Sequence, residues 1–367
     1  MQTDMHYYGT YAMARAAGLN VKEARTIAYA AQYVDDSTSN DSETHPDGGM
    51  FQTIATAHTN SETILNALVD QTEQRNVWVP FHFFPGNQGT TLSQRLACVE
   101  DGELAQEMVS NHIQHAAKVK DDYGLALLGI MAHVYADTFS HYGFSGVSSR
   151  NNQVNGDSFE LKVKDDGMRA YILNKYTAFL VKYMPRSITK NYREFVGEGS
   201  AAVTLGLGHG AVGTYPDRPF LKWRFNFKKD NRDSGWRDNP ATFLNGCEKL
   251  HQRFCQYNAI VNPGNTGEDF NKIKPVVEKI LRSERDQQGR IELWRDAITS
   301  GELFTNEANE ALSYSKDDWE EQKSNFTRLQ HSHKMIKHDV YKFHQAAVYH
   351  RDYTLKQLLP KHGLIVV

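Results

Sequence analysis

Apolar residues recur at helical spacing along most of the chain, and the strict alternation of strands is nearly absent. In residues 21–36 the apolar face is continuous, and Asn20 with Glu23 has the spacing of a capping box at the start of a helix. Residues 123–144 are apolar on nearly all sides, which is typical of a helix buried within a protein. We therefore predict an all-α protein.

Other segments depart from this pattern. Residues 36–49 are polar and rich in turn formers, so we predict a loop. Residues 76–87 are aromatic and contain two prolines, and we expect an extended segment that crosses the core with His82 at its centre. In residues 214–236 aromatic and basic residues interleave in a long irregular connection.

From 317 to about 359 one or two long charged helices follow. We expect their histidines mostly at the surface: His331, His333, His338, His344 and His350.

The composition excludes several classes of protein. The 367 residues include 41 Lys and Arg against 44 Asp and Glu, and the net charge of −3 disfavours a polybasic nucleic-acid binder. There is no uninterrupted apolar run of about eighteen residues, so we expect no integral membrane segment. The first residues lack the pattern of a secretory leader, and the three scattered cysteines fit a reducing compartment. We expect a cytoplasmic protein, or one exported without a conventional signal peptide.

The buried helix carries polar groups that are unusual in so apolar a segment. His133, Asp137 and His141 follow at intervals of four, so they project from one side, roughly 6 Å apart along the axis. Two imidazoles and a carboxylate suit Zn²⁺, and a buried carboxylate is costly without a cation. The outer two histidines lie roughly 12 Å apart along the axis, so we predict two or three metal ions that share Asp137. Asp35, on the apolar face of residues 21–36, needs a partner for the same reason.

One motif points elsewhere. Residues 208–213, GHGAVG, match the GxGxxG pattern of dinucleotide-binding proteins, and Asp233 follows about twenty residues later. However, Pro216 and Pro219 interrupt the helix that should follow, and no strand–helix–strand pattern surrounds the motif. We therefore reject a dinucleotide site.

Four phrases, IAYAAQYVDD, FHFFPG, AHVYADTFSHYGFSG and GHGAVGTYPD, together resemble an uncharacterised bacterial branch of the zinc-dependent phospholipase C and single-strand nuclease superfamily. Members of that superfamily are all-α phosphodiesterases with up to three zinc ions. Their central helix carries a His, an Asp four residues later and a His six residues beyond that, whereas the second interval here is four. The phrases cover most of residues 1–225, and the rest of the chain is not matched.

The resemblance implies ligands near the N-terminus. The early histidine of the superfamily corresponds to His6, with Asp4 as the alternative, and its aspartate at the end of an early helix corresponds to Asp35 or Asp36. Superfamily members begin with a tryptophan whose amine and carbonyl bind zinc. This chain has Met1 at that place, so we expect Asp4 with His6 to take the role.

The resemblance also implies ligands from later segments. His82 matches a histidine that follows a loop in the superfamily, with His45 and His58 as alternatives. His209 followed by Asp217 loosely matches a later pair of ligands. The expected metal ligands are therefore His6, Asp35, His82, His133, Asp137, His141, His209 and Asp217.

The activity implied by the resemblance is that of a metal-dependent phosphoric-diester hydrolase acting through a metal-bound hydroxide. Two or three Zn²⁺ ions are expected, with iron or manganese as alternatives. Asp35 or Asp36 would orient or deprotonate the water. The substrate would be a phosphodiester small molecule or a phospholipid head group, since the charge does not indicate nucleic acid. A basic and aromatic stretch would hold phosphate or stack on a base: Arg218, Lys222, Trp223 and Arg224.

The expected fold is a multi-helix bundle of the phospholipase C and nuclease type. Residues 1–300 would form a helical metal-binding catalytic domain, and residues 301–367 a C-terminal helical extension packed on it. Two other functions could use the same residues. One is a di-iron oxygenase, because His and Asp also bind iron. The other is a non-catalytic helical module in which metal ions hold the helices together.

Overall fold

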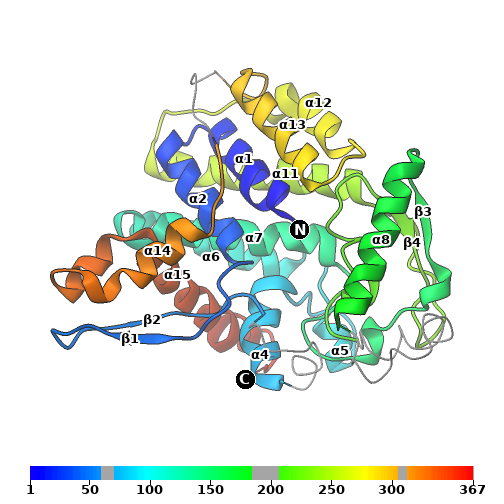
Figure 1. Ribbon diagram of the computed structural model, residues 1–367, viewed down its shortest axis with the longest axis horizontal. Helices are drawn as coiled ribbons and strands as arrows, with labels where there is room; N and C mark the ends of the chain where they lie inside the picture. The colour runs from blue at the N-terminus through cyan, green and yellow to red at the C-terminus, as the bar shows by residue number, and fades with distance from the viewer. Residues whose placement is uncertain (59–69, 184–205, 305–311, 367) are drawn as a thin grey trace.

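The computed structural model describes residues 1–58, 70–183, 206–304 and 312–366, and this part of the chain is mostly helical (Figure 1). The prediction of a helical protein is confirmed, although two small antiparallel sheets are added. The α-helices are α1 (Thr10–Ala16), α2 (Val21–Tyr33), α4 (Gln71–Glu73), α5 (Leu92–Arg95), α6 (Glu103–Lys118), α7 (Leu125–His141), α8 (Asp166–Tyr183), α11 (Asn239–Val261), α12 (Phe270–Leu281), α13 (Gln287–Thr299), α14 (Asp317–Ser324), α15 (Asp339–Tyr353) and α16 (Leu359–Lys361).

The predicted buried helix is α7, which runs through the middle of the molecule (Figure 1). It packs against α2, α6, α11 and α15, and every residue from Ala126 to His141 is buried. Helix α2 begins with the predicted capping box of Asn20 and Glu23. It approaches α7 closely at Gly129, where a Cβ atom would lie 2.4 Å from the carbonyl oxygen of Ile27. Any charge on α7 therefore needs a partner from the protein or a bound ion.

Two of the wider, π-type helices lie at the site described below. The π-helices are η1 (Asp4–Gly9), η2 (Gln74–His82), η3 (Lys120–Gly124) and η10 (Thr354–Leu358). The expectation of an extended segment over residues 76–87 is wrong, because η2 is helical as far as His82 and contains Pro80. The amide of Phe83 donates to the carbonyl of Trp78, five residues earlier. This wider turn accommodates Pro80, whose missing amide hydrogen would interrupt an α-helical ladder.

Short 3₁₀ turns and strands connect the helices. The 3₁₀ turns are η4 (Arg150–Asn152), η5 (Gly156–Ser158), η7 (Gly210–Val212), η8 (Phe326–Arg328) and η9 (Ser332–Lys337). The strands are β1 (Ser42–Thr44) paired with β2 (Met50–Gln52), and a sheet in the order β3 (Glu160–Lys162), β4 (Lys222–Arg224) and β5 (Arg237–Asp238). The predicted loop over 36–49 therefore contains β1, and the predicted irregular connection over 214–236 contains β4. Strands this short show too little alternation to be predicted.

A second hydrophobic core lies beside the main helical core. It surrounds β4 and includes Phe83, Phe144, Trp223 and Phe225. Helix α8 and strands β3 and β4 lie together on this side of the molecule (Figure 1). Phe83 follows η2, which contacts α7, so the second core begins close to the C-terminal end of the central helix. In the described part of the chain, no helix has both the length and the apolarity needed to cross a bilayer.

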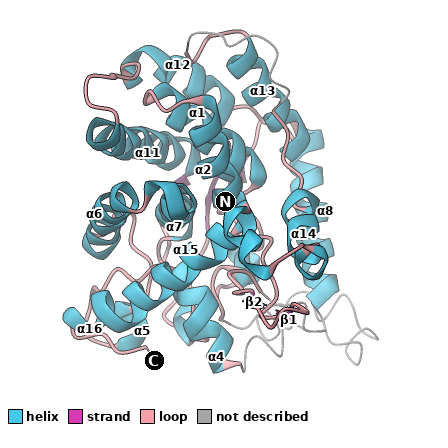
Figure 2. Ribbon diagram, turned by 90° about the vertical axis from the view of Figure 1, so that its left-hand side faces the viewer, coloured by secondary structure: helices cyan, strands magenta, loops and turns pink. Residues whose placement is uncertain are grey.

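The C-terminal helices lie directly against the central helix. Helix α15 packs on α7 and η2, and α14 packs on α15; Figure 2 shows α15 beside α7 from a second direction. The expectation that His344 and His350 lie at the surface is wrong, because both are fully buried. They occupy the apolar side of α15 with Val340, Phe343 and Ala347, at the i, i+3, i+4 spacing of a packed helix face.

Candidate metal centre

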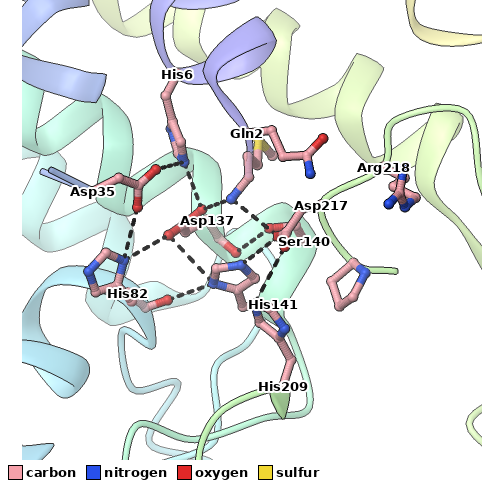
Figure 3. Close-up of polar contacts among 12 residues, drawn as sticks. Gln2, His6, Asp35, His82, Asp137, Ser140, His141, His209, Asp217 and Arg218 are labelled. Carbon is pink, nitrogen blue, oxygen red and sulfur yellow. Dashed lines mark hydrogen bonds and ion pairs between the residues drawn. The ribbon is translucent and has the colours of Figure 1, made fainter. Parts of the chain in front are cut away.

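The predicted ligands converge on Asp137, which is buried near the C-terminal end of α7 (Figure 3). One carboxylate oxygen, Oδ1, lies 3.3 Å from Nε2 of His6 on η1. The other oxygen, Oδ2, lies 3.3 Å from Nε2 of His133 and 3.5 Å from Nδ1 of His141, its neighbours one turn away on α7. It also lies 3.6 Å from Nδ1 of His82 at the end of η2. Three separate segments therefore bring four imidazoles to one carboxylate.

Asp35 extends the centre on one side. It follows the end of α2, and its Oδ1 lies 3.8 Å from Nδ1 of His82 and 3.9 Å from Nε2 of His133. Its Oδ2 lies 3.9 Å from Nε2 of His6. Its side chain is 33% exposed, whereas that of Asp137 is 2% exposed. Asp35 is therefore the carboxylate of the centre that solvent reaches most easily.

Asp217 extends the centre on the other side. Its Oδ1 lies 3.1 Å from Nε2 of His141, and its Oδ2 lies 3.7 Å from Nε2 of His209. His209 precedes the turn η7, and Asp217 follows this turn by five residues. Gly208 has a φ of +54°, and a Cβ atom there would lie 2.4 Å from the ring of Phe83. A glycine is thus needed for His209 to approach η2 and α7.

Four of these histidines are held by a hydrogen bond from one ring nitrogen to a backbone carbonyl. A carbonyl oxygen only accepts, so the bonded nitrogen carries the hydrogen, and the opposite nitrogen of a neutral ring presents a lone pair. An outer acceptor that fixes the tautomer in this way is typical of metal-binding histidines. The pairs are His82 Nε2 with Thr56 (2.7 Å), His133 Nδ1 with Ala31 (2.8 Å), His141 Nδ1 with His82 (2.8 Å) and His209 Nδ1 with Gly213 (2.7 Å).

Lone pairs consequently face one another inside the centre. Nε2 of His133 and Nδ1 of His82 lie 3.3 Å apart, and both rings already donate their other nitrogen to a carbonyl. Both ring nitrogens of His6 and Oδ2 of Asp137 are buried and have no hydrogen-bond partner among the described residues. Such contacts are unfavourable unless a proton or a cation lies between the atoms. This donor set therefore fits a metal ion.

The amino group of Met1 contributes a positive charge to the centre. It lies 2.6 Å from Oδ1 of Asp137 and 3.3 Å from Oδ1 of Asp217, so one ammonium group contacts two carboxylates. Burial alone would lower the pKa of this amine, but attraction to Asp137 and Asp217 outweighs burial and raises the pKa to about 11. The resemblance implies an N-terminal amine at this place. The expectation that Asp4 with His6 replaces this amine is wrong, because Met1 itself supplies the amine.

Asp4 lies away from the centre. Its carboxylate accepts hydrogen bonds from Arg290 on α13, at 2.7 Å from Nε and 3.2 Å from Nη2, and both side chains are fully buried. Arg290 also donates to the side chain of Gln2 and to the carbonyl of Arg285. This network holds η1 in place and so positions His6, but it supplies no donor to the centre.

The protonation states of Asp137, His209 and His6 suit metal binding. At His82 burial lowers the pKa, but the hydrogen bond to Asp137 and the charge of Asp35 outweigh burial and raise it. Burial opposes ionisation of Asp137, but the surrounding histidines and the Met1 amine outweigh burial and hold its pKa well below the usual range. Burial lowers the pKa of His209 to about 4, although Asp217 acts in the opposite direction. Burial also lowers the pKa of His6. At neutral pH the carboxylate is charged and these two rings are neutral, which are the forms that bind metals.

Three groups of donors could each hold a metal ion. In each group the ligand atoms lie within 4.8 Å of one another, and His133 belongs to two of the groups. The mixture of imidazole and carboxylate suits zinc and similar divalent ions. The groups are His6 with His133 and Asp137, Asp35 with His82 and His133, and His141 with His209 and Asp217.

A cavity of about 280 Å³ opens onto the centre. Its lining combines candidate ligands with an apolar part. None of the described residues that line it is an arginine or a lysine. The place of Trp78 and Phe83 in the cavity could have been predicted from the sequence, because Trp78 lies four residues before His82 and Phe83 directly follows it. Nothing in the sequence pattern indicated that Phe179 lines the cavity. The apolar part is formed by Ala57, Trp78, Phe83, Phe179 and Leu207.

The remaining sequence candidates lie elsewhere. Asp36 accepts hydrogen bonds from Tyr314 and Gln32, so it is turned toward the C-terminal segment. His45 lies 2.8 Å from the carbonyl of Leu329. None of the residues proposed to bind substrate lines the cavity. Arg218 is buried near Thr214, Lys222 pairs with Asp238, Trp223 donates to Asn239 within the second core, and Arg224 pairs with Glu160.

Comparisons with known proteins add a family but no activity. The comparison with curated proteins and the comparison with solved structures each returned no match. The sequence matches a family of unknown function, DUF6765, over residues 1–358. All the candidate ligands described above lie within that range. The chain therefore belongs to the DUF6765 family.

Proposed function

We propose that this protein is a metal-dependent phosphoric-diester hydrolase, with zinc as the metal that best suits its donors. The observation that carries the proposal is the convergence of imidazole lone pairs and three carboxylates at the floor of a cavity. The resemblance to the zinc-dependent phospholipase C and nuclease superfamily gives the same class of reaction. We infer the hydrolytic activity from this geometry together with this resemblance.

The three donor groups would hold the metal ions. Zinc bound there supplies Lewis acidity and lowers the pKa of water toward neutrality, and neighbouring ions can stabilise both the attacking and the leaving oxygen of a phosphodiester. The absence of arginine and lysine among the described cavity-lining residues supports this assignment. Without metal ions, the negative charge of a phosphodiester would meet carboxylates and imidazole rings, and the ammonium group of Met1 is already paired with Asp137 and Asp217.

Asp35 is our candidate for the residue that orients the attacking water and accepts its proton. It lies at the edge of the centre, lines the cavity and is the most exposed of the three carboxylates. A general base must reach both its water and the solvent to which it returns the proton. Asp36 could not act in this way without leaving Tyr314 and Gln32.

Two alternative functions fit the site less well. Di-iron carboxylate proteins built on helical bundles take most of their ligands from glutamates on facing helices. Here histidines outnumber carboxylates, and several ligands come from turns. A structural metal site is closed around its ion, whereas this centre opens onto a cavity. These features favour an enzyme with an accessible metal.

The test is hydrolysis by the purified protein of bis(4-nitrophenyl) phosphate, a phosphatidylcholine and single-stranded DNA. We expect hydrolysis of at least one diester, loss of it after treatment with a chelator, and recovery when zinc is restored. Asp35→Asn should lower the rate strongly, and Asp36→Asn, the neighbouring carboxylate, should not. A protein that binds metal at these residues but cleaves none of the three diesters would contradict the proposal.

A further inference from the structure

A histidine and a glutamate form a close pair at the wall of the cavity. Nδ1 of His58 lies 2.6 Å from Oε1 of Glu73. The Glu73 side chain is 7% exposed, whereas that of His58 is 24% exposed and lines the cavity. A buried carboxylate therefore holds an imidazole that remains accessible to anything bound in the cavity.

Both residues are tied to segments that build the metal centre. His58 lies two residues after Thr56, whose carbonyl accepts the hydrogen bond from His82. Glu73 is the last residue of α4 and leads directly into η2, which carries His82. The pair is therefore held in a defined position relative to the ligands.

Trp78 is close both to the pair and to one of the ligands. Its ring centroid is 5.9 Å from that of His58 and 6.2 Å from that of His82. Trp78 also lines the cavity. A bound molecule that contacts both His58 and His82 would therefore lie near this aromatic ring.

The chemistry of the pair follows from the two ring nitrogens. Because the Glu73 carboxylate only accepts, Nδ1 of His58 carries the hydrogen that lies between them. The exchangeable position is then Nε2, to which none of the described residues hydrogen-bonds. A carboxylate in this position fixes the tautomer and the orientation of the ring, as in other histidine–carboxylate pairs that transfer protons.

We propose that His58 is the general acid that protonates the leaving oxygen of the phosphodiester, and that Glu73 positions it. This inference rests on the function proposed above. As the oxygen of water bonds to phosphorus, the phosphorus–oxygen bond to the leaving group breaks. The proton of His58 Nε2 passes to the leaving oxygen, which departs as an alcohol, while Asp35 accepts a proton from the water. The products are an alcohol and a phosphomonoester, and His58 regains its proton from solvent.

The chain offers a matched control for this pair. Nε2 of His362 lies 2.8 Å from Oε2 of Glu107, and both side chains are 33% exposed. This second histidine–glutamate pair does not line the cavity. His362→Gln therefore removes the same kind of contact without touching the proposed acid.

The experiment compares leaving groups. A 4-nitrophenolate leaves without protonation, whereas the alcohol of an alkyl phosphodiester needs a proton. We expect His58→Gln to lower kcat/KM for the alkyl diester about 10²–10⁴-fold, the usual contribution of general acid catalysis, and to change hydrolysis of bis(4-nitrophenyl) phosphate far less. Metal content should stay unchanged, and His362→Gln should affect neither substrate.

The outcomes separate this inference from the proposed function. If the wild type cleaves both diesters and His58→Gln slows both equally or neither, the assignment of the acid is wrong and the proposed function stands. If the metal-loaded wild type cleaves neither, the proposed function fails and this assignment fails with it. Loss of metal in His58→Gln would contradict the assignment as well, because His58 would then act on the centre.

Glu73→Gln tests the positioning role through the same comparison of leaving groups. Without the carboxylate, the His58 ring loses the partner that fixes its tautomer and orientation. The kcat/KM for the alkyl diester should then fall, while hydrolysis of bis(4-nitrophenyl) phosphate changes far less. An equal fall for both substrates would show a purely structural role and overturn this part of the inference.

Discussion

Two groups of buried histidines lie beside the central helix, and they differ in their surroundings. One group surrounds Asp137 and includes His133 and His82, with carboxylates within 4 Å of the inward ring nitrogens. The other group consists of His112 on α6 and His350 on α15. There, Nε2 of His112 is 2.9 Å from Nδ1 of His350, whose Nε2 donates to the carbonyl of Pro80 at 2.8 Å. Among the described residues, the second pair has no carboxylate partner.

The difference shows what distinguishes a metal site from a structural pair. Burial lowers the pKa of His350 to about 4 and that of His112 well below its usual range, so both rings are neutral and complete a chain of hydrogen bonds. The carbonyl of Pro80 lies in the last turn of η2, where no helical amide reaches it, and His350 supplies the donor. Burial of a histidine is common to both groups. Of these two groups, and among the described residues, the one around Asp137 has ring nitrogens without a hydrogen-bond partner that lie near carboxylates.

The largest expected effect separates the two groups directly. His133→Leu removes a donor shared by two ligand groups, so we expect loss of metal. The rate of hydrolysis should fall by well over the roughly 100-fold that is lost when a residue hydrogen-bonded to a metal ligand is removed. His350→Leu should keep metal and activity while lowering the free energy of unfolding by about 1–3 kcal/mol, because it leaves polar atoms of His112 and Pro80 unpaired. Equal loss of metal in both variants would break the comparison.

A large effect on stability is expected where the N-terminal segment is held. Arg290→Met leaves the buried carboxylate of Asp4 without its partner, which should lower the free energy of unfolding by about 3–5 kcal/mol. Urea denaturation measures this change. The double variant Arg290→Met with Asp4→Leu should recover part of the loss, and a single variant as stable as the wild type would contradict the buried network.

A buried histidine outside the metal centre, His344, should make the stability of the protein depend on pH. His344 accepts a hydrogen bond from the amide of Ile54, and burial together with repulsion from Lys323 lowers its pKa to about 3. The unfolded chain takes up this proton near pH 6.5, so stability is full above that pH and falls as the pH decreases toward 3. Between pH 6.5 and 4.5 the loss from His344 should be about 2–3 kcal/mol. Denaturation of chelator-treated protein should show a smaller acid loss for His344→Gln, and an unchanged slope would contradict this.

The smallest effects are expected in the basic and aromatic stretch. Lys222 pairs with Asp238 and Arg224 with Glu160 at the surface of the small sheet. Exposed pairs contribute little, so Lys222→Ala should change stability by about 1 kcal/mol or less. Neither Lys222→Ala nor Arg224→Ala should alter KM for a diester. A marked rise in KM would place substrate on this sheet and contradict the cavity assignment.

Much of the centre could be predicted because its ligands follow local patterns. His133, Asp137 and His141 lie on one helix at intervals of four, and Asp35 ends the apolar face of α2. In the structure these residues lie together with His6, His82, His209 and Asp217. The geometry of a helix was enough to place the first three, the apolar face of α2 indicated Asp35, and the resemblance supplied the other candidates.

The sequence could not give contacts between distant segments. The choice between Asp35 and Asp36 depends on Tyr314, the position of Asp4 depends on Arg290, and the pairing of His58 depends on Glu73. The prolines and aromatic residues around His82 suggested extended chain, yet a π-helix accommodates Pro80. His344 and His350 were misplaced because the charged residues of α15 hid its narrow apolar face.

The central claim is tested most directly by the metal content of the purified chain. Elemental mass spectrometry should find two or three zinc ions per chain in the wild type and a clear loss in Asp137→Ala, with circular dichroism to show that the variant is folded. The Glu107→Ala variant, which removes a carboxylate far from the centre, should keep the wild-type content. Wild-type protein that binds no metal, even after dialysis against zinc, would contradict the account.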